Sequence, residues 1–323
     1  MKQNLLGIDI GGTKCAVTHG ISDGQKIDIV DKLKFDTTKV DATIASLLET
    51  TATIMKKHGL DTRNTAAIGI SCGGPLDSKK GLIMSPPNLP GWDNIPIVDL
   101  FEKRLGVKTA VQNDANACAL AEWKFGAGRG HNNVAFLTFG TGMGAGFILD
   151  GKLYAGTNDN AGEIGHIRLE KTGPVGYGKA GSFEGFCSGS GIAQMARTKA
   201  MEKLQMGEPV SFCKTQADLN NITAKLVAES AAAGDPLAKE VYAECGHYMG
   251  KALSILMDIL NPEVIILGSI YCRAQSLIEP TMNAAIEHDA LSHARRVCKV
   301  VPAALGESIG DYAALSVAAN AIP

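Results

Sequence analysis

The stretch LLGIDIGGTKCAV, residues 5–17, decides the fold of this protein. Residues 5–10 predict a buried strand, but Asp9 interrupts their apolar run and the turn Gly-Gly-Thr-Lys follows. A buried carboxylate needs a full set of hydrogen-bond donors or a cation. Glycines after a strand let backbone N–H groups approach a phosphate, and Mg²⁺ keeps much of its water shell there. The stretch therefore predicts a phosphate-binding turn with Asp9 beside a hydrated magnesium ion; the plainer alternative is a tight hairpin with a structural acid.

The same opening occurs a second time along the chain. Residues 133–139 form another apolar run, which ends in GTGMGAG at residues 140–146. The dipeptide Asp150–Gly151 then predicts a two-residue hairpin turn. Because strand, glycine loop and hairpin occur twice, the sequence predicts two related halves.

Strands and helices alternate over the rest of the chain. Strands are expected at 66–71, 107–111, 264–267 and 297–302, and long helices at 189–205, 215–233 and 236–260. This alternation is typical of an α/β fold. The length of 323 residues favours two domains. We expect an N-terminal domain over 1–114, a larger C-terminal domain over 115–310, and a closing helix, 311–323, that returns to the first.

Neither glycine loop has the spacing of a common nucleotide motif. The pattern GxxxxGK[ST] of the Walker A loop is absent. The glycines of the first loop lack the GxGxxG spacing of dinucleotide-binding proteins, and a hairpin rather than a helix is expected after them. A phosphate site built from these loops is therefore of a different kind.

Composition and charge exclude several classes of protein. Lys and Arg number 31 and Asp and Glu number 33, so bulk charge gives no surface for nucleic acid or an acidic membrane. Eight widely spaced cysteines are typical of reduced core thiols in a cytoplasmic protein. No apolar leader with a cleavage site precedes the first strand, and no uncharged stretch is long enough to span a membrane. We expect a cytoplasmic protein without a membrane segment.

The pair Asn113–Asp114 follows a short strand and opens an alanine-rich helix. An Asx residue here is often only the N-cap of the helix. The carboxyl ends of strands are also where the sites of α/β proteins gather. Asp114 is therefore a candidate for the carboxylate that accepts a proton from an acceptor hydroxyl during phosphoryl transfer.

Several motifs, taken as an ordered set, resemble a known family. GIDIGGTK (7–14), GTGMGAG (140–146) and Gly268 after EVIIL are similar to the two phosphate loops and the adenosine loop of the sugar kinase, heat-shock chaperone and actin ATPase superfamily. CGGP (72–75), NLPGW (88–92), ND (113–114) and GEIGH (162–166) resemble the ROK family of bacterial sugar kinases and related repressors. The resemblance runs from residue 5 to about residue 268. It implies two related actin-like ATPase (ribonuclease H-like) domains with a cleft between them.

The resemblance also implies cofactors, substrate and site residues. ATP and Mg²⁺ would be the cofactors, a hexose the substrate, and Asp114 the general base toward the sugar 6-hydroxyl. Sugar contacts are implied for Gly74, Asn88, Asn113, Asp114, Glu163, His166 and Glu184. Nucleotide contacts are implied for Asp9, Gly11, Gly12, Thr13, Lys14, Gly140, Thr141, Gly142 and Gly268, with Asp9 meeting the magnesium ion through water. Trp92 is expected to pack in the core or a pocket wall. Family habit suggests a homodimer.

The sequence departs from its family in one place. Many ROK proteins carry a zinc hairpin with the pattern CxCGxxGC before a glutamate. The corresponding stretch here is GPVGYGKAGSFE, residues 173–184, with Val175, Tyr177 and Ser182 at the cysteine positions. Structural zinc takes four ligands, mostly Cys and His. We therefore expect no zinc, and expect packing by Val175, Tyr177 and Phe183 to replace it in holding His166.

Three functions remain open from the sequence. The first is an ATP-dependent kinase for a hexose or N-acetylhexosamine; glucose, N-acetylglucosamine, N-acetylmannosamine and allose are not distinguished. The second is a sugar-sensing repressor, which in this family carries an additional N-terminal helix-turn-helix domain. The expected start of the ATPase fold at residue 5 and the charge of −2 disfavour it. The third is a non-catalytic sugar-binding relative or a chaperone-like ATPase.

Overall fold

The computed structural model describes residues 2–322, which divide into two compact units. Unit 1 holds the described residues up to Phe136, Gly146–Gly162 and those from Ala304 on; unit 2 holds Leu137–Ala145 and Glu163–Ala303. The boundary expected after Asp114 lies inside unit 1, and as a boundary between domains it stays a prediction. No helix within residues 2–322 has both the length and the apolar character needed to cross a membrane.

The regular elements follow in chain order. The strands are β1 (Gln3–Ile10), β2 (Lys14–Ser22), β3 (Ile27–Asp36), β4 (Thr65–Cys72), β5 (Leu76–Asp77), β6 (Leu82–Ile83), β7 (Thr109–Asn113), β8 (Val134–Phe139), β9 (Met143–Leu149), β10 (Lys152–Tyr154), β11 (Val175–Gly176), β12 (Lys179–Ala180), β13 (Val264–Leu267) and β14 (Lys299–Pro302). The helices are α1 (Val40–Lys57), α2 (Ile97–Leu105), α3 (Asp114–Phe125), α4 (Phe183–Phe186), α5 (Gly189–Gln205), α6 (Ala224–Ala232), α7 (Pro236–Leu260), α8 (Ile270–Asp289), α9 (Ser292–Val297) and α10 (Ile309–Ala321).

Two five-stranded sheets have the same strand order. The first is β3-β2-β1-β4-β7 and the second is β10-β9-β8-β13-β14. In the first, β2 is antiparallel to β1 and β3, whereas β4 is parallel to β1 and β7. In the second, β9 and β10 are antiparallel and β13 and β14 are parallel. This repeated order confirms the α/β fold built from two related actin-like ATPase halves.

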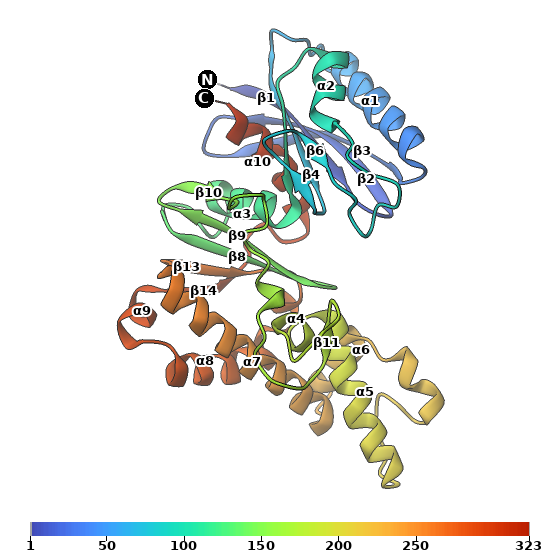
Figure 1. Ribbon diagram of the computed structural model, residues 1–323, viewed down its shortest axis with the longest axis vertical. Helices are drawn as coiled ribbons and strands as arrows, with labels where there is room; N and C mark the ends of the chain where they lie inside the picture. The colour runs from blue at the N-terminus through green and yellow to red at the C-terminus, as the bar shows by residue number, and fades with distance from the viewer. Residues whose placement is uncertain (1, 323) are drawn as a thin grey trace. The chain divides into compact units, whose positions relative to one another are not determined.

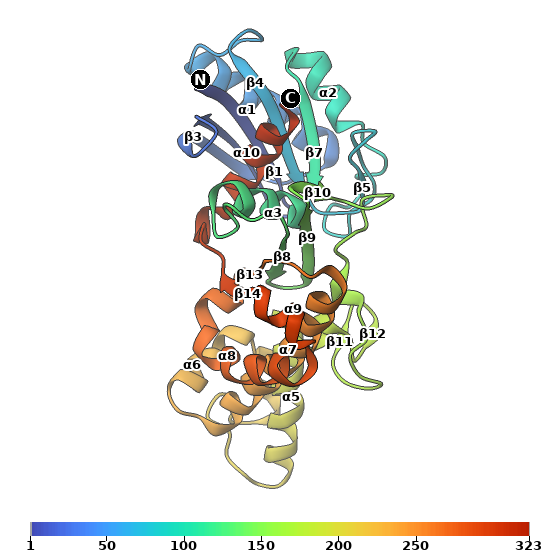
Figure 2. The same ribbon diagram turned by 90° about the vertical axis from the view of Figure 1, so that its left-hand side faces the viewer.

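The two faces of β1 are covered by different helices. Ile8 belongs to the larger core cluster, together with Leu47 of α1 and Phe101 of α2. Leu5, whose side chain points to the opposite face, packs with Leu315 of α10. Figures 1 and 2 show α1 and α2 on one side of this sheet and α10 on the other. The side chain of Asp9, two residues on from Gly7 and four from Leu5, therefore belongs to the α10 face.

Glycines bring α10 close to the sheet. Gly7 and Gly69 are register partners on the parallel strands β1 and β4. A Cβ on Gly69 would lie 2.2 Å from the backbone oxygen of Ala314 and from the backbone nitrogen of Ala318. A Cβ on Gly7 would lie 2.9 Å from the backbone nitrogen of Leu315, so α10 also lies directly on β1, the strand that carries Asp9.

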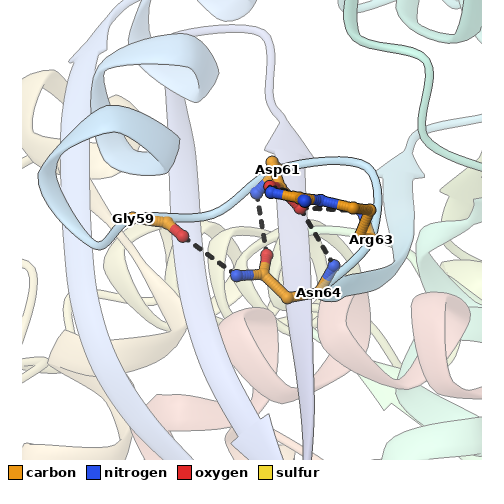
Figure 3. Close-up of polar contacts among 4 residues, drawn as sticks. All are labelled: Gly59, Asp61, Arg63 and Asn64. Atoms are coloured by element: carbon orange, nitrogen blue, oxygen red, sulfur yellow. Dashed lines mark hydrogen bonds and ion pairs between the residues drawn. The ribbon is translucent and has the colours of Figure 1, made fainter.

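The loop between α1 and β4 is held by its own polar side chains (Figure 3). Gly59 has φ +63°, as expected for the glycine that ends the helix. Asn64 Nδ2 donates to the Gly59 carbonyl oxygen at 2.9 Å, and the Asp61 amide donates to Asn64 Oδ1 at 2.7 Å. Arg63 Nε donates to Asp61 Oδ2 at 3.0 Å. These bonds fix the entry of the chain into β4.

Unit 2 departs from the expected helices in one place. The stretch 215–233 is not a single helix: a 3-10 segment covers Gln216–Asn221, and α6 begins after Thr223. Thr215 and Thr223 both act as N-caps, so the chain starts a new helix twice in this stretch. Further on, α7 and α8 pack side by side (Figure 2).

Candidate functional site

The side-chain carboxylate of Asp9, on β1, faces the start of α10 and has no hydrogen-bond partner among residues 2–322. A Cβ on Gly310, in the first turn of α10, would lie 3.5 Å from Asp9 Oδ2. Across residues 2–322, no hydrogen bond or ion pair involves the Asp9 carboxylate. The pKa of Asp9 is raised to about 6. Burial is the main cause, and the negative charges of Asp311 and Asp114 contribute as well. The structural alternative, a buried acid with a full set of donors, is therefore not what the fold provides.

Asp311 is a functional candidate that the sequence pattern did not reveal. It stands in the first turn of α10 and forms an ion pair with Lys32 of β3. Thr18 Oγ1 donates a hydrogen bond to Asp311 Oδ1 at 3.3 Å. An acidic residue in the first turn of a helix is ordinarily explained by its favourable interaction with the helix dipole. Only the fold shows that Asp311 also acts on the pKa of Asp9.

Asn113 and Asp114 divide two roles between them. Asn113, the last residue of β7, is the N-cap of α3 and accepts the amide of Asn116 at 2.8 Å. Asp114 begins the helix; its side chain is open to solvent, and its Oδ1 accepts the amide of Ala115 at 2.8 Å. Although the side chain is accessible to solvent, many protein atoms lie around the carboxylate. The resulting desolvation raises the pKa of Asp114. Asp114 is thus a carboxylate that a solute can reach at the end of a strand.

The turn 11–14 closes the hairpin between β1 and β2. The Gly11 amide donates to the Lys14 carbonyl at 3.1 Å. A Cβ on Gly12 would lie 2.5 Å from the Asn88 carbonyl oxygen, so the turn rests on the segment that carries this predicted sugar residue. Thr37, which the sequence pattern did not single out, donates to the Gly11 carbonyl at 2.6 Å and supports the turn. Lys14 and its neighbour Thr13 are exposed.

The loop 72–75 and Asn88 are neighbours in the same unit. The Gly74–Pro75 peptide bond is cis. A Cβ on Gly73 would lie 3.9 Å from Asn88 Nδ2. Asn88 is exposed, whereas Trp92 is buried, as expected for a residue of the core. Unit 1 thus gathers the predicted turn 11–14, Asp9, Asp114 and Asn88.

In unit 2, the second glycine loop is held by Glu184 and the start of α5. Glu184 Oε2 accepts the amide of Met143 at 3.0 Å, and a Cβ on Gly142 would lie 2.9 Å from this oxygen. The Gly189 amide donates to the Gly140 carbonyl at 2.8 Å. Thr141, at the tip of the loop, is exposed. One carboxylate oxygen of Glu184 therefore shapes the loop, which is a role beyond the predicted sugar contact.

The motif 162–166 packs on the same loop. Residues Ile164–His166 form a 3-10 turn that follows the exposed Glu163. A Cβ on Gly165 would lie 2.4 Å from the Met143 carbonyl oxygen and 3.2 Å from the Glu184 Cβ. Unit 2 therefore brings the three predicted sugar residues Glu163, His166 and Glu184 to the glycine loop.

Gly268 ends β13 beside this loop. Its amide donates to the Leu137 carbonyl of β8 at 3.0 Å. Ser269, which follows it, has φ +48° and accepts a hydrogen bond from Arg273 at 3.2 Å. The chain then enters α8 next to a cavity of about 530 Å³. Its lining comes from α6, α7 and α8: Ala224, Lys225, Ala228, Glu229, Ala232, Tyr242, Ile270, Arg273 and Ala274.

This cavity could not be predicted from sequence patterns, because its walls come from three separate helices. Four of its lining residues are alanines, which leave space between the helices. Over residues 2–322, no group of three or more His, Cys, Asp or Glu side chains is arranged to hold a metal ion. The absence of zinc from the hairpin 173–184 stays a prediction.

The comparisons with known proteins agree with one another. Residues 5–320 match the family described as the ROK family. A glucokinase of Streptomyces coelicolor is 30% identical over 321 residues, 98% of each chain. The crystal structure of a ROK family glucokinase from Streptomyces griseus, in complex with glucose and AMPPNP, is 29% identical with a TM-score of 0.74 and covers 98% of this chain and 99% of that one.

A regulator is also similar. The DNA-binding transcriptional dual regulator NagC of Escherichia coli is 29% identical over 271 residues, which are 83% of this chain and 64% of the regulator. From the match over residues 5–320, we conclude that this chain belongs to the ROK family.

Proposed function

We propose that this protein is an ATP-dependent hexose kinase that phosphorylates the sugar 6-hydroxyl, with Asp114 as the general base. The observation that carries the proposal is the solvent-accessible carboxylate of Asp114 at the end of β7, in the same unit as Asp9 and the turn 11–14. The similarity to glucokinases supports the class of substrate.

Asp114 is suited to take a proton from an alcohol. One of its oxygens is held by the Ala115 amide, which fixes the direction of the carboxylate. Its raised pKa makes it a stronger base than an ordinary aspartate. In phosphoryl transfer the protein mainly positions the hydroxyl and accepts its proton late, so a carboxylate is sufficient.

The residues present fit Mg·ATP. Asp9 is a carboxylate without a protein partner among the described residues, and it is the group expected to hold the water shell of a magnesium ion. When bound, Mg·ATP supplies the phosphoryl group and the positive charge that offsets its oxygens. We propose that phosphates bind to the backbone N–H groups of the turn 11–14 and of the loop 140–142. The glycines in each have no side chain to block a phosphate, and the exposed hydroxyls of Thr13 and Thr141 add donors.

The cavity between α6, α7 and α8 is our candidate for the adenosine pocket. Its volume of about 530 Å³ lies in the usual range for a small-molecule site. Ala228 and Ala274 leave room for a flat ring, and Tyr242 offers an aromatic wall. The cavity begins directly after Gly268, as an adenosine loop at that position requires.

We propose that fixed polar groups bind the sugar. Asn88 in unit 1 and Glu163 and His166 in unit 2 are not buried, and each can exchange hydrogen bonds with ring hydroxyls. We propose an aldohexose or an N-acetylhexosamine as the substrate. We further propose a homodimer, and a cytoplasmic location because all eight cysteines are free thiols.

A sugar panel and one substitution test the proposal. Purified protein with Mg·ATP should release ADP only with a matching hexose, and the product should be the 6-phosphate by NMR. Asp114→Asn should lower kcat by about 10²–10⁴, the usual contribution of a general base, while ATP binding is kept. The matched control is Asp99→Asn, an exposed acid of α2, which should leave kcat unchanged. Near-normal turnover of Asp114→Asn would refute the assignment of the base.

A sugar-sensing protein without kinase activity is the second candidate, because the NagC regulator is also similar. Calorimetry separates the two. Sugar binding without any ADP release, in the presence of Mg·ATP, would favour the sensor. ATP turnover that ignores every sugar would instead favour a chaperone-like ATPase.

A further inference from the structure

The hairpin of β11 and β12 has an unusual residue in its turn. Gly176 pairs with Lys179, so Tyr177 and Gly178 are the only two residues of the turn. Their φ angles are +44° and +75°. A two-residue turn with positive φ at both positions strongly favours Asn, Asp or Gly first, since a bulky side chain crowds left-handed backbone. Tyr177 is therefore a poor choice for the turn itself.

Another hairpin of this chain shows the favoured solution. Asp150 and Gly151 connect β9 and β10 with φ angles of +50° and +70°. The two turns thus share their length and the signs of φ, and differ in having Asp or Tyr at the first position. The comparison isolates the side chain of Tyr177 as the feature that needs an explanation.

Burial does not explain the tyrosine. Its exposed fraction is 73%, so little apolar surface is removed from water to offset the strained backbone. Within the described chain, the phenol group has no hydrogen bond. Its one aromatic contact among the described residues is with His166: the ring centroids are 5.2 Å apart and the planes meet at 80°. Such an edge-to-face pair restricts the rotation of both rings.

The rest of the hairpin is anchored without Tyr177. Gln194 of α5 donates to the Val175 carbonyl at 2.8 Å and accepts the Val175 amide at 3.0 Å. A Cβ on Gly176 would lie 2.8 Å from the Glu184 Cβ, so this strand rests on α4. Lys179 Nζ donates to the His166 carbonyl at 2.7 Å, which fixes the backbone of His166 but leaves its ring free to turn.

We propose that Tyr177 is a positioning residue that orients the His166 imidazole toward the sugar; this inference rests on the proposed function. Neither ring nitrogen of His166 has a hydrogen-bond partner in the described residues, so both are available to sugar hydroxyls. Tyr177 then fixes the ring by its edge-to-face contact and takes none of this hydrogen-bonding capacity. The strained turn is the consequence of placing an aromatic ring at the tip of a two-residue hairpin.

The test uses a substitution that improves the turn and removes the ring. Tyr177→Asn places a favoured residue at this position, so the melting temperature should stay equal or rise. The sugar KM should nevertheless increase about three- to tenfold, the effect of losing an aromatic pair of 0.5–1.5 kcal/mol. Tyr177→Phe keeps the ring and should stay within about twofold of the parent protein in sugar KM.

The reciprocal control is Asp150→Tyr, which puts the poor residue into the other hairpin. It should lower the melting temperature and leave the sugar KM unchanged. A purely structural role of Tyr177 predicts instead that sugar KM follows stability, so that Tyr177→Asn would bind sugar normally. An unchanged sugar KM in Tyr177→Asn therefore overturns the inference.

A measurement without substrate separates this inference from the proposed function. In the free protein, the Cε1–H resonance of His166 should lose its ring-current shift in Tyr177→Asn and keep it in Tyr177→Phe. An unchanged resonance in Tyr177→Asn also overturns the inference. If the parent protein phosphorylates no sugar, the proposed function fails, and the resonance of His166 alone decides whether Tyr177 orients that ring.

Discussion

Gly7 and Gly69 are neighbours on the parallel strands β1 and β4, and α10 packs directly against the backbone of both residues. The same close approach brings the first turn of α10, with Asp311, to the carboxylate of Asp9. The packing of the last helix and the electrostatics of the candidate site therefore have one structural cause.

Gly69→Ala should destabilise the protein strongly. The new Cβ would lie 2.2 Å from backbone atoms of Ala314 and Ala318, which cannot move without the whole helix. We expect a loss of at least about 3 kcal/mol in the free energy of unfolding, the upper range for overpacking. Urea unfolding measures it. The control is Gly207→Ala, where φ is +76° but nothing lies within 4 Å, so that only backbone strain of about 1 kcal/mol is expected. Equal losses in both variants would contradict a steric role for Gly69.

Asp9→Asn should stabilise the free protein above pH 7. Burial raises the pKa of Asp9 from 3.8 to about 6 in the folded state. The folded protein thus binds this proton more tightly than the unfolded chain, so its stability falls as pH rises from about 4 through 6 and stays lower above that range. We expect a gain of roughly 1–3 kcal/mol for Asp9→Asn at pH 8 and almost none at pH 4.

Urea unfolding at several pH values measures this difference. Asp99→Asn, at an exposed position in α2, should show no such gain. A variant Asp9→Asn that is less stable than the parent protein at pH 8 would show that Asp9 has favourable partners in the fold.

Glu122→Ala should be more damaging than Glu122→Gln. Glu122 of α3 is fully buried and its carboxylate accepts the amides of Ala127 at 2.8 Å, Ala304 at 3.2 Å and Leu305 at 2.9 Å. Alanine leaves all three donors unpaired, at about 1–3 kcal/mol each, whereas glutamine keeps one acceptor oxygen. We expect a loss of at least about 3 kcal/mol for alanine and a smaller loss for glutamine by urea unfolding. Equal losses in both variants would mean that the charge, which both substitutions remove, and not the acceptor oxygens, determines the effect.

Ala228→Leu should weaken ATP binding and leave the fold intact. The larger side chain would fill part of the cavity of about 530 Å³ that we propose for adenosine. We expect the KM for ATP to rise at least about tenfold, equivalent to about 1.4 kcal/mol, with little change in the sugar KM. Ala233→Leu is the matched control, because Ala233 is an exposed residue at the end of the same helix and does not line the cavity. Unchanged ATP binding in Ala228→Leu would place adenosine elsewhere.

Local patterns in the sequence were sufficient for the repeated part of the fold. The apolar run before each glycine loop gave β1 and β8, and Asp150–Gly151 gave the hairpin of β9 and β10. Asn113 and Asp114 were correctly placed at the junction of a strand and a helix. These features follow from turn chemistry and side-chain alternation, which depend on neighbours in sequence.

Features that depend on distant residues needed the structure. Residues 215–233 read as one helix by periodicity, but two N-caps divide them. The cavity of α6, α7 and α8 has no sequence signature because its walls come from three helices whose packing depends on residues far apart in the chain.

By itself, the sequence determined two related α/β halves, the glycine loops and the family, because strand alternation and glycine turns are encoded over a few residues. Only the tertiary structure decided which groups act on one another. It set Asp311 beside Asp9, engaged Glu184 with the Met143 amide, and placed the ring of Tyr177 against His166. Burial, charge interactions and ring contacts depend on distances between residues far apart in the chain, and those distances exist only once the elements have packed.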